Sequence, residues 1–378
     1  MIVVIVICML LGIGYAALML LYRKGWQEQP TFVVDEDFTP ITTLSIIIPA
    51  RNEEASIGRC LDSIFAQDYP QHLIEVVVID DHSTDATASI VKGYNEPNLK
   101  CLHLADYLND ETIAYKKKAL TTGINNSIGE LIVTTDADCF AGNQWLKHIA
   151  AIYEKEEPVM IVAPVDFTTN GDVVQTFQSL DFMSMQGITG AAHKLNLGNM
   201  SNGANLAFSR KAYLSVDGYK GIDHLASGDD YLLMMKLNAA WPSRIAYLKA
   251  EEAIVHTPPQ PTWGSFLQQR IRWASKSGKY DDKRLTGILL LVYLFNFYFL
   301  VLLLLGFWNG WLWALALTLL VLKTEVEIYY LYPVSRFFHK RKQLWIFPLL
   351  QPLHILYIIS AGFLGFVGVY KWKGRKVK

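Results

Sequence analysis

The chain has 378 residues, of which 52% are hydrophobic and only 18% are charged. This balance is too apolar for an ordinary soluble protein of this length, so the excess is expected in separate membrane-spanning blocks. The formal net charge of −1 gives no reason to expect nucleic-acid binding. The four cysteines form no Cys-x-x-Cys pair, which argues against a zinc site and fits a reduced, cytosolic domain.

The first apolar block covers residues 2–22, carries no charge and is long enough to cross a hydrocarbon core of about 30 Å as a helix. Nothing basic precedes it and no cleavage-site pattern ends it, so we interpret it as a retained anchor rather than a signal peptide. Arg23 and Lys24 follow directly, and the positive-inside rule places the next segment in the cytoplasm. The sequence thus predicts an anchor at 1–22 and a cytosolic domain at 23–284.

Residues 285–378 form a predicted membrane region with three further apolar blocks, at 285–307, 311–322 and 344–370. The basic loop 336–342 is expected on the cytoplasmic side. A simple last crossing would place the equally basic tail 371–378 outside, so the charge rule conflicts with itself. Pro348 and Pro352 allow a broken or re-entrant last segment instead, and this crossing is left open.

Between residues 23 and 284, short apolar runs alternate with helix-like stretches, as in a single α/β domain. The runs 44–49 and 74–79 have the β-branched, apolar composition of buried strands, and the strand-like run 131–135 is similar. Residues 99–104 are expected to supply a further strand. Polar residues repeatedly follow these runs. Because open α/β sheets bind nucleotides outside the carboxyl ends of their strands, the pattern predicts a nucleotide site.

Two acidic pairs follow predicted strands. Asp136 and Asp138 come directly after the run 131–135, and two carboxylates at this spacing can turn toward one hard cation that also binds phosphate. Asp80 and Asp81 follow the run 74–79, where a carboxylate can accept hydrogen bonds from a uracil imide or from ribose hydroxyls. A solvated turn is the alternative for Asp136 and Asp138, and a helix cap is the alternative for Asp80 and Asp81.

A third acidic pair, Asp229 and Asp230, lies in a Ser-Gly-Asp-Asp turn that opens at Ser227 and precedes an apolar helical stretch. A carboxylate here can act as the general base that deprotonates an acceptor hydroxyl. Helix capping explains the same spacing equally well. Lys117, within the lysine run 116–118, is a further candidate for contact with a diphosphate, although charge runs are usually solvated.

The stretch Gln-Arg-Ile-Arg-Trp at 269–273 lies just before the second apolar block. On a helix, Gln269 and Trp273 share one face and Arg272 lies beside them. Arginine can stabilise the negative charge on a departing diphosphate, and tryptophan can stack or anchor at a membrane surface. By itself, this stretch would be interpreted as a basic interfacial helix.

Taken together, these motifs resemble the family 2 glycosyltransferases with a GT-A fold. The matching segments occur in the family's order, at 48–54, 78–85, 135–138, 203–206, 228–230 and 269–273. The resemblance implies an α/β fold, a Rossmann-like mixed sheet flanked by helices that binds a nucleotide-diphospho-sugar, plus transmembrane helices. Where the family often has Glu-Asp this chain has Gly228-Asp229, so both Asp229 and Asp230 stay candidates for the base.

The resemblance also implies roles for the motif residues. Asp80 and Asp81 would contact the nucleoside, and Asp136 and Asp138 would handle a Mg²⁺ or Mn²⁺ ion and the diphosphate. Asp229 would be the catalytic base. Gln269, Arg272 and Trp273 would close over the donor.

The implied activity is an inverting, metal-dependent transfer of a sugar, with a UDP-sugar as the expected donor, to a lipid or glycan acceptor. The protein would be a multi-pass protein of the inner (plasma) membrane with a cytoplasmic catalytic domain. A processive polysaccharide synthase is the main alternative. A membrane nucleotidyl- or phosphotransferase would leave Asp229 and Arg272 unexplained, and the set of acidic motifs argues against a non-catalytic scaffold.

Overall fold

The computed structural model describes residues 2–108, 114–198, 200–225, 228–275, 282–367, 370–372 and 375–377. Ser227 of the Ser-Gly-Asp-Asp turn and residues 373–374 and 378 of the basic tail lie outside these ranges. The chain folds as two compact units. The sheet unit comprises Pro30–Asp166 and Met200–Pro258, and the helical unit comprises Met1–Gln29, Phe167–Asn199 and Pro259–Lys378.

These units do not follow the order of the sequence. Residues 167–199 lie in the middle of the predicted cytosolic domain, yet they belong to the same compact unit as the apolar helices. The predicted domain boundaries after residues 22 and 284 stay a prediction. Tertiary contacts group the segments differently, because one helix from the middle of the chain packs against the N-terminal and C-terminal helices.

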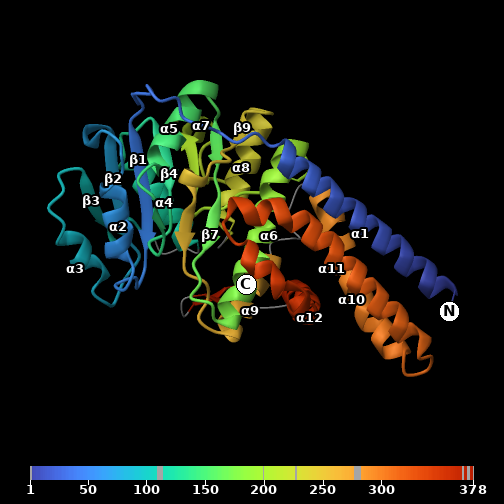
Figure 1. Ribbon diagram of the computed structural model, residues 1–378. Coiled ribbons are helices and arrows are strands. Elements are labelled where there is room, and N and C mark those ends of the chain that lie inside the picture. The colour runs from blue at the N-terminus through green and yellow to red at the C-terminus, as the bar shows by residue number, and fades with distance from the viewer. Residues whose placement is uncertain are drawn as a thin grey trace. The chain divides into compact units, whose positions relative to one another are not determined.

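The sheet unit is built on a seven-stranded sheet with the order β3-β2-β1-β4-β8-β6-β9 (Figure 1). The strands are β1 (Leu44–Ala50), β2 (Ile74–Asp80), β3 (Leu99–His103), β4 (Leu131–Thr134), β6 (Met160–Val162), β8 (Leu206–Ser209) and β9 (Ile245–Tyr247). Strand β8 runs antiparallel to β4 and β6, whereas the other neighbouring pairs are parallel. The predicted mixed sheet is therefore confirmed, and the four predicted strands are β1 to β4.

Strand β1 lies at the centre of the parallel part, where Ile47 is in register with Val77 of β2 and Thr134 of β4. Its isoleucines are fully buried, which explains why the run is apolar at every position rather than at alternate ones. Because β2 and β4 flank β1 in parallel, their carboxyl ends lie at one edge of the sheet. The residues that follow these ends are thereby placed together.

A second, three-stranded sheet has the order β5 (Phe140–Ala141), β10 (Val255–Thr257) and β7 (Val165–Phe167). Helices complete the sheet unit. The α-helices are α2 (Ile57–Phe65), α3 (Thr87–Lys92), α4 (Tyr115–Asn125), α5 (Trp145–Glu156), α7 (Arg210–Ser215) and α8 (Asp229–Ala240). Short 3₁₀ turns are η1 (Gln71–Leu73), η2 (Leu104–Tyr107) and η3 (Glu251–Ala253). Helix α4 packs directly on β1 and β2, which brings its first turn toward the carboxyl edge of the sheet.

The helical unit contains α1 (Ile2–Glu28), α6 (Val173–Leu195), α9 (Trp263–Ala274), α10 (Lys283–Leu305), α11 (Trp311–Phe337) and α12 (Phe347–Val367). The turn η5 (Arg341–Trp345) precedes α12, and the strands β11 (Tyr370–Trp372) and β12 (Arg375–Val377) follow it. Within the described ranges, α1, α10 and α12 are long and apolar enough to span a membrane. Helix α11 contains the predicted block 311–322 but continues into a charged second half.

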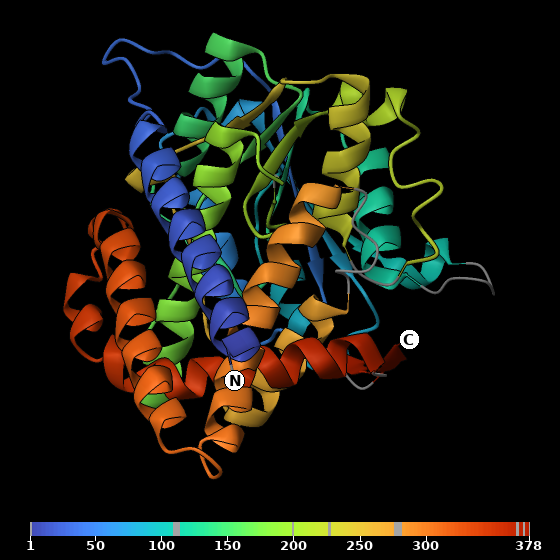
Figure 2. The same ribbon diagram turned by 90° about the vertical axis from the view of Figure 1, so that its right-hand side faces the viewer.

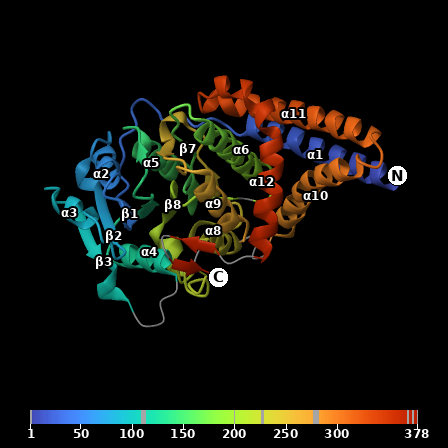
Figure 3. The same cartoon turned by 90° about the horizontal axis from the view of Figure 1, so that it is seen from below.

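Helices α1, α10 and α11 lie side by side, whereas α12 runs crosswise to them (Figures 2 and 3). Near the N-terminus, Cys8 of α1 packs with Leu302 of α10 and with Leu312 and Ala316 of α11. The N-terminal half of α1 therefore lies beside the connection between α10 and α11.

A buried ion pair explains how α11 carries charge among apolar helices. Lys323 Nζ lies 2.7 Å from Glu327 Oε1 and donates to Gln351 Oε1 of α12, also at 2.7 Å. Glu327 also accepts hydrogen bonds from the Tyr15 hydroxyl of α1 and from the Gln351 amide. Because each charge has an opposite charge and further hydrogen bonds, the pair does not leave an uncompensated ion in an apolar surrounding.

Candidate active site

Asp80 and Asp81, the first acidic pair along the chain, lie at the end of β2. The Asp81 amide donates to the carbonyl of Ala50 at the end of β1, and Asp80 Oδ1 accepts the amide of Ser83. Both aspartates are more than nine-tenths buried. Asp80 Oδ2 lies 3.3 Å from His103 Nδ1, and Asp81 Oδ1 lies 2.9 Å from the Nδ1 of the next residue in the chain. The pair therefore follows the carboxyl end of a parallel strand, as predicted.

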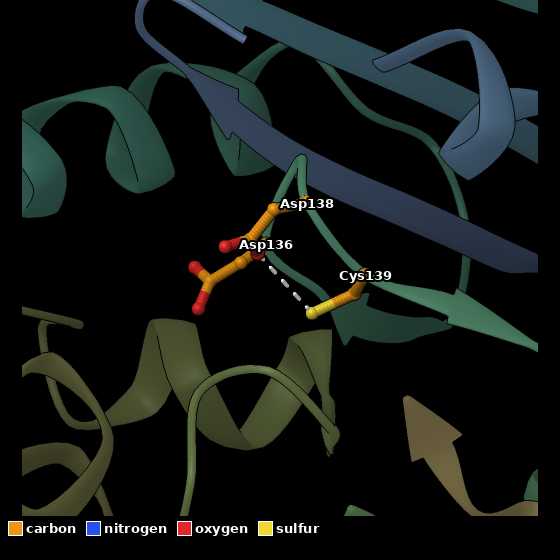
Figure 4. Close-up of side chains that lie close together, drawn as sticks. All are labelled: Asp136, Asp138 and Cys139. Carbon is orange, nitrogen blue, oxygen red and sulfur yellow. Dashed lines mark hydrogen bonds between the residues drawn. The ribbon is translucent and has the colours of Figure 1, made fainter. Parts of the chain in front are cut away.

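The second pair lies in the loop between β4 and β5. Figure 4 shows the side chains of Asp136, Asp138 and Cys139 next to one another. Each offers one possible ligand atom, and these atoms lie within 4.8 Å of one another. The Asp136 side chain is 38% exposed, so it remains open to an incoming group.

This donor set fits a hard divalent cation. Two carboxylates at one loop supply the oxygen ligands that Mg²⁺ and Mn²⁺ prefer. Burial raises the pKa of the Cys139 thiol well above its usual range, and its Sγ lies 3.6 Å from Asp138 Oδ1. The protonated thiol is a poor ligand for such ions, so the two aspartates are the residues that would hold the cation.

Lys116 of α4 forms ion pairs with one aspartate from each of two acidic pairs, Asp136 and Asp229. Its Nζ lies 2.8 Å from Asp136 Oδ1 and 3.4 Å from Asp229 Oδ2. Burial lowers the pKa of this ammonium, but the carboxylates of Asp136 and Asp229 outweigh that effect and hold the pKa above its usual range. A positive charge therefore lies between the predicted metal-binding loop and the predicted base.

Asp229 and Asp230 begin α8, after Gly228 in the left-handed conformation at φ 81°. Asp229 is 8% exposed and points to Lys116, whereas Asp230 accepts the amides of Gly203 and Tyr231. The two neighbouring carboxylates thus have different environments. Asp230 accepts backbone hydrogen bonds, as a capping residue does, whereas Asp229 faces Lys116.

The segment Gly203-Ala204-Asn205 borders the same place. The Asn205 amide is fully buried and donates to the carbonyls of Pro164 and Ala253, which holds the segment against the neighbouring loops. A Cβ at Gly203 would lie 3.2 Å from Asp229 Oδ2 and 3.7 Å from Lys116 Nζ. Glycine therefore lets the backbone approach the carboxylate closely.

Lys117 points to a different place from Lys116. It is 1% exposed, and its Nζ donates to the carbonyls of Ile222 and Leu225 at 2.9 and 2.5 Å. Lys117 therefore stabilises the loop before α8 through these hydrogen bonds. Its predicted contact with a diphosphate stays a prediction. On a helix, adjacent residues point in different directions, so a run of three lysines cannot all face one site.

Gln269, Arg272 and Trp273 lie on α9 of the helical unit. The helix begins with a capping box in which Thr262 and Ser265 exchange side-chain and backbone hydrogen bonds. All three predicted residues are partly exposed, whereas Arg270 between them is buried. Arg270 is not among the predicted site residues, because its position in the sequence does not distinguish it from Arg272.

Comparisons with known proteins identify the family of the chain. The family model described as "Glycosyl transferase family 2" matches residues 45–215, and the model described as "Glycosyl transferase family group 2" matches residues 131–359. The second match covers more than half of the chain and includes Asp136, Asp138, Asp229 and α9.

Two curated relatives come from archaea. Glycosyltransferase AglE of Haloferax volcanii is 28% identical over 233 residues, which is 61% of this chain and 71% of that protein. The second is the dolichyl N-acetyl-alpha-D-glucosaminyl phosphate 3-beta-D-2,3-diacetamido-2,3-dideoxy-beta-D-glucuronosyltransferase of Methanococcus voltae. It is 34% identical over 125 residues, which is 30% of this chain and 36% of that protein. The chain thus spans about a third of the second relative.

A solved structure is similar over nearly the whole length. The mannosyltransferase PcManGT from Pyrobaculum calidifontis, in complex with GDP-Man and Mn²⁺, aligns with a TM-score of 0.59 and 19% identity. The alignment covers 96% of this chain and 98% of that one, and at this identity it supports the fold. The family models establish that this chain is a glycosyltransferase enzyme of glycosyltransferase family 2, and the structural similarity supports its GT-A fold.

Proposed function

We propose that the chain transfers a sugar from a nucleotide sugar, with a UDP-sugar as the first donor to test, to a lipid or glycan acceptor with inversion at the anomeric carbon. The observation that carries this proposal is the group formed by Asp136, Asp138, Lys116 and Asp229 at the carboxyl edge of the sheet. The Lys116 ammonium lies beside the Asp136 and Asp229 carboxylates there. Binding of a diphosphate next to a general base requires both positive and negative groups at one place. The relative with a dolichyl phosphate in its name supports a lipid-linked acceptor.

In the proposed reaction, Asp80 and Asp81 bind the nucleoside, and Asp136 and Asp138 hold Mg²⁺ or Mn²⁺. A divalent cation, when bound there, supplies positive charge beside the diphosphate. Asp229 takes the proton of the acceptor hydroxyl as its oxygen forms the bond to the anomeric carbon. The bond between that carbon and the diphosphate oxygen breaks in the same step.

The family resemblance supports further roles for residues of α9 in the proposed mechanism. Arg272 stabilises the charge of the departing diphosphate, and Gln269 and Trp273 bind the donor. These roles come from the family resemblance and from the partial exposure of the three side chains on α9. The nucleoside diphosphate then leaves, and no covalent bond between sugar and enzyme forms.

We also propose the arrangement in the membrane. Helices α1, α10 and α11 cross the bilayer, and α12 lies along its cytoplasmic surface, because α12 runs crosswise to the other three (Figure 3). Several apolar side chains of α12 are exposed, among them Leu349, Leu356, Phe363 and Phe366. This arrangement keeps the catalytic unit, the basic loop 336–342 and the basic tail on one side, which removes the conflict in the charge rule.

Donor turnover tests the proposal directly. The purified full chain in detergent is incubated with UDP-glucose, UDP-N-acetylglucosamine or GDP-mannose and a dolichyl-phosphate or diacylglycerol acceptor, and release of nucleoside diphosphate is followed. We expect release with Mn²⁺ or Mg²⁺, loss of release with EDTA, and loss in Asp136→Asn and Asp138→Asn. If the chain releases no nucleoside diphosphate from any of the donors, the proposed transfer is wrong for these substrates.

Product mass separates the two candidate reactions. A single added sugar supports transfer to a lipid, and a ladder of products supports the processive alternative. The helical unit favours the single transfer, since few helices in the described ranges are available to enclose a growing glycan.

A further inference from the structure

A buried cluster around Asp181 joins three helices of the helical unit. Arg270 of α9 donates from Nε and Nη2 to Asp181 Oδ2 of α6, at 3.0 and 2.7 Å. The Tyr357 hydroxyl of α12 donates to Asp181 Oδ1 at 2.9 Å, and His354 Nε2 lies 3.6 Å from the same oxygen. The side chains of Asp181 and Arg270 are only 5% and 3% exposed.

The carboxylate in this cluster is ionised at neutral pH. Burial by itself raises the pKa of Asp181, but the Arg270 charge and the contact with His354 outweigh it and lower the pKa to about 2. The cluster is therefore an ion pair that is closed off from solvent. Such a pair gives little net stability compared with apolar side chains of similar volume, so stability is a weak reason for its presence.

Arg270 also contacts two of the residues assigned to donor binding. Its Nη1 donates to Gln269 Oε1 at 2.9 Å, and its guanidinium carbon lies 4.2 Å from the centre of the Trp273 ring. The same group lies 4.7 Å from the centre of the Phe266 ring. The Arg270 guanidinium thus donates hydrogen bonds to Asp181 and Gln269 and also lies over the Trp273 ring.

We propose that Arg270, held by Asp181 and Tyr357, is a positioning residue that sets the orientation of Gln269 and Trp273 for the nucleotide-sugar donor. This inference rests on the proposed function, since the donor role of Gln269 and Trp273 belongs to it. The planar guanidinium, with donors in a fixed fork, can make all these contacts at once. A lysine ammonium has neither the fork nor the flat face.

Two single-hydroxyl variants form a matched pair for the test. Tyr357→Phe removes the hydrogen bond from α12 to Asp181. Tyr330→Phe removes an equivalent bond from α11 to α6, because the Tyr330 hydroxyl donates to the carbonyl of Ser184 at 2.8 Å. Both changes are mild enough to leave the fold intact, and only the first reaches Arg270.

The measurement is equilibrium binding of UDP-glucose, UDP-N-acetylglucosamine and GDP-mannose, each with Mn²⁺, by titration calorimetry of the full chain in detergent. For the donor that the parent chain binds, we expect Tyr357→Phe to raise Kd about tenfold, which corresponds to about 1.4 kcal/mol of binding free energy. Tyr330→Phe should bind with the parent's Kd. Arg270→Lys, which keeps the charge but loses the fork, should raise Kd at least as much as Tyr357→Phe.

The titration separates positioning from folding. A variant that only unfolds lowers the number of binding sites and leaves Kd unchanged, whereas misplaced Gln269 and Trp273 raise Kd at full occupancy. Parent-like Kd values in both Tyr357→Phe and Arg270→Lys would overturn the inference and leave the proposed function standing. If the parent chain binds none of the three donors, the proposed function falls, and the inference falls with it.

Discussion

At the scale of single residues, the structure separates neighbours that the sequence presents as equivalent. Asp229 faces Lys116 at 3.4 Å, whereas Asp230 accepts two backbone amides. We expect Asp229→Asn to lower kcat about 10²- to 10⁴-fold, the range for removal of a general base. Asp230→Asn should lower it only a few-fold, because an amide oxygen still accepts one of the two hydrogen bonds.

Steady-state release of nucleoside diphosphate, with the donor KM measured in parallel, checks this prediction. The donor KM should stay close to the parent value in Asp229→Asn, since that residue acts on the acceptor proton. A larger loss in Asp230→Asn than in Asp229→Asn would assign the base to Asp230.

The two adjacent lysines give a second contrast at this scale. Lys116→Met removes the charge beside Asp136 and Asp229, and we expect activity to fall about tenfold or more while stability changes little. Lys117→Met leaves the carbonyls of Ile222 and Leu225 without that donor, and we expect a loss of about 1–3 kcal/mol in the free energy of unfolding.

Thermal unfolding in detergent and nucleoside diphosphate release, measured on both variants, decide between the lysines. Loss of activity at unchanged stability in Lys117→Met, with Lys116→Met active, would return the diphosphate contact to Lys117.

At the scale of elements, the close packing of α4 on the sheet brings Lys116 to the acidic loop. A Cβ at Gly123 of α4 would lie 2.6 Å from Ile79 Cδ1 and 2.7 Å from Ile47 Cγ2, and both isoleucines are fully buried. We expect Gly123→Ala to destabilise the protein by about 1–3 kcal/mol, because overpacking outweighs the gain of up to about 1 kcal/mol in helix propensity.

Gly58 of α2 is the matched control for this change. Its Cβ would meet only the Tyr94 hydroxyl, at an ordinary contact distance of 3.6 Å, so Gly58→Ala should cost no stability. The two thermal unfolding curves provide the comparison. Equal stability of the two variants would show that α4 can move away from the sheet.

At the scale of the whole molecule, the proposed crossings of α10 and α11 place their connection and the loop before α12 on opposite sides of the membrane. Trp308 in the connection is 83% exposed, and Lys342 in the loop is exposed as well. In intact cells, a membrane-impermeant maleimide should label Trp308→Cys but not Lys342→Cys. Lys342→Cys should react only after the membrane is opened.

The parent chain, with its four cysteines, supplies the background for both measurements. Labelling of both variants from the same side would contradict the crossing of the α10–α11 pair. The ion pair of Lys323 and Glu327 supports the proposed crossing of α11, since each of these two charges is paired within the helical unit.

Much of the sheet could be predicted from local pattern. The runs that became β1, β2 and β4 are mostly apolar because these strands are buried on both faces, and two acidic pairs lie at or just after the ends of β2 and β4. The directions of individual side chains could not be predicted in the same way. Lys116 and Lys117 are adjacent residues of the same type, and only the packing of α4 decides which one meets the carboxylates.

Sequence by itself determined the family, the mixed α/β class and the apolar segments, because these follow from residue order and short-range periodicity. Tertiary structure alone decided that residues 167–199 join the apolar helices, that Lys116 lies between Asp136 and Asp229, and that Arg270 is held by Asp181. The physical reason is distance along the chain. Asp181 and Arg270 are 89 residues apart, and such contacts depend on the packing of whole helices, which local pattern does not encode.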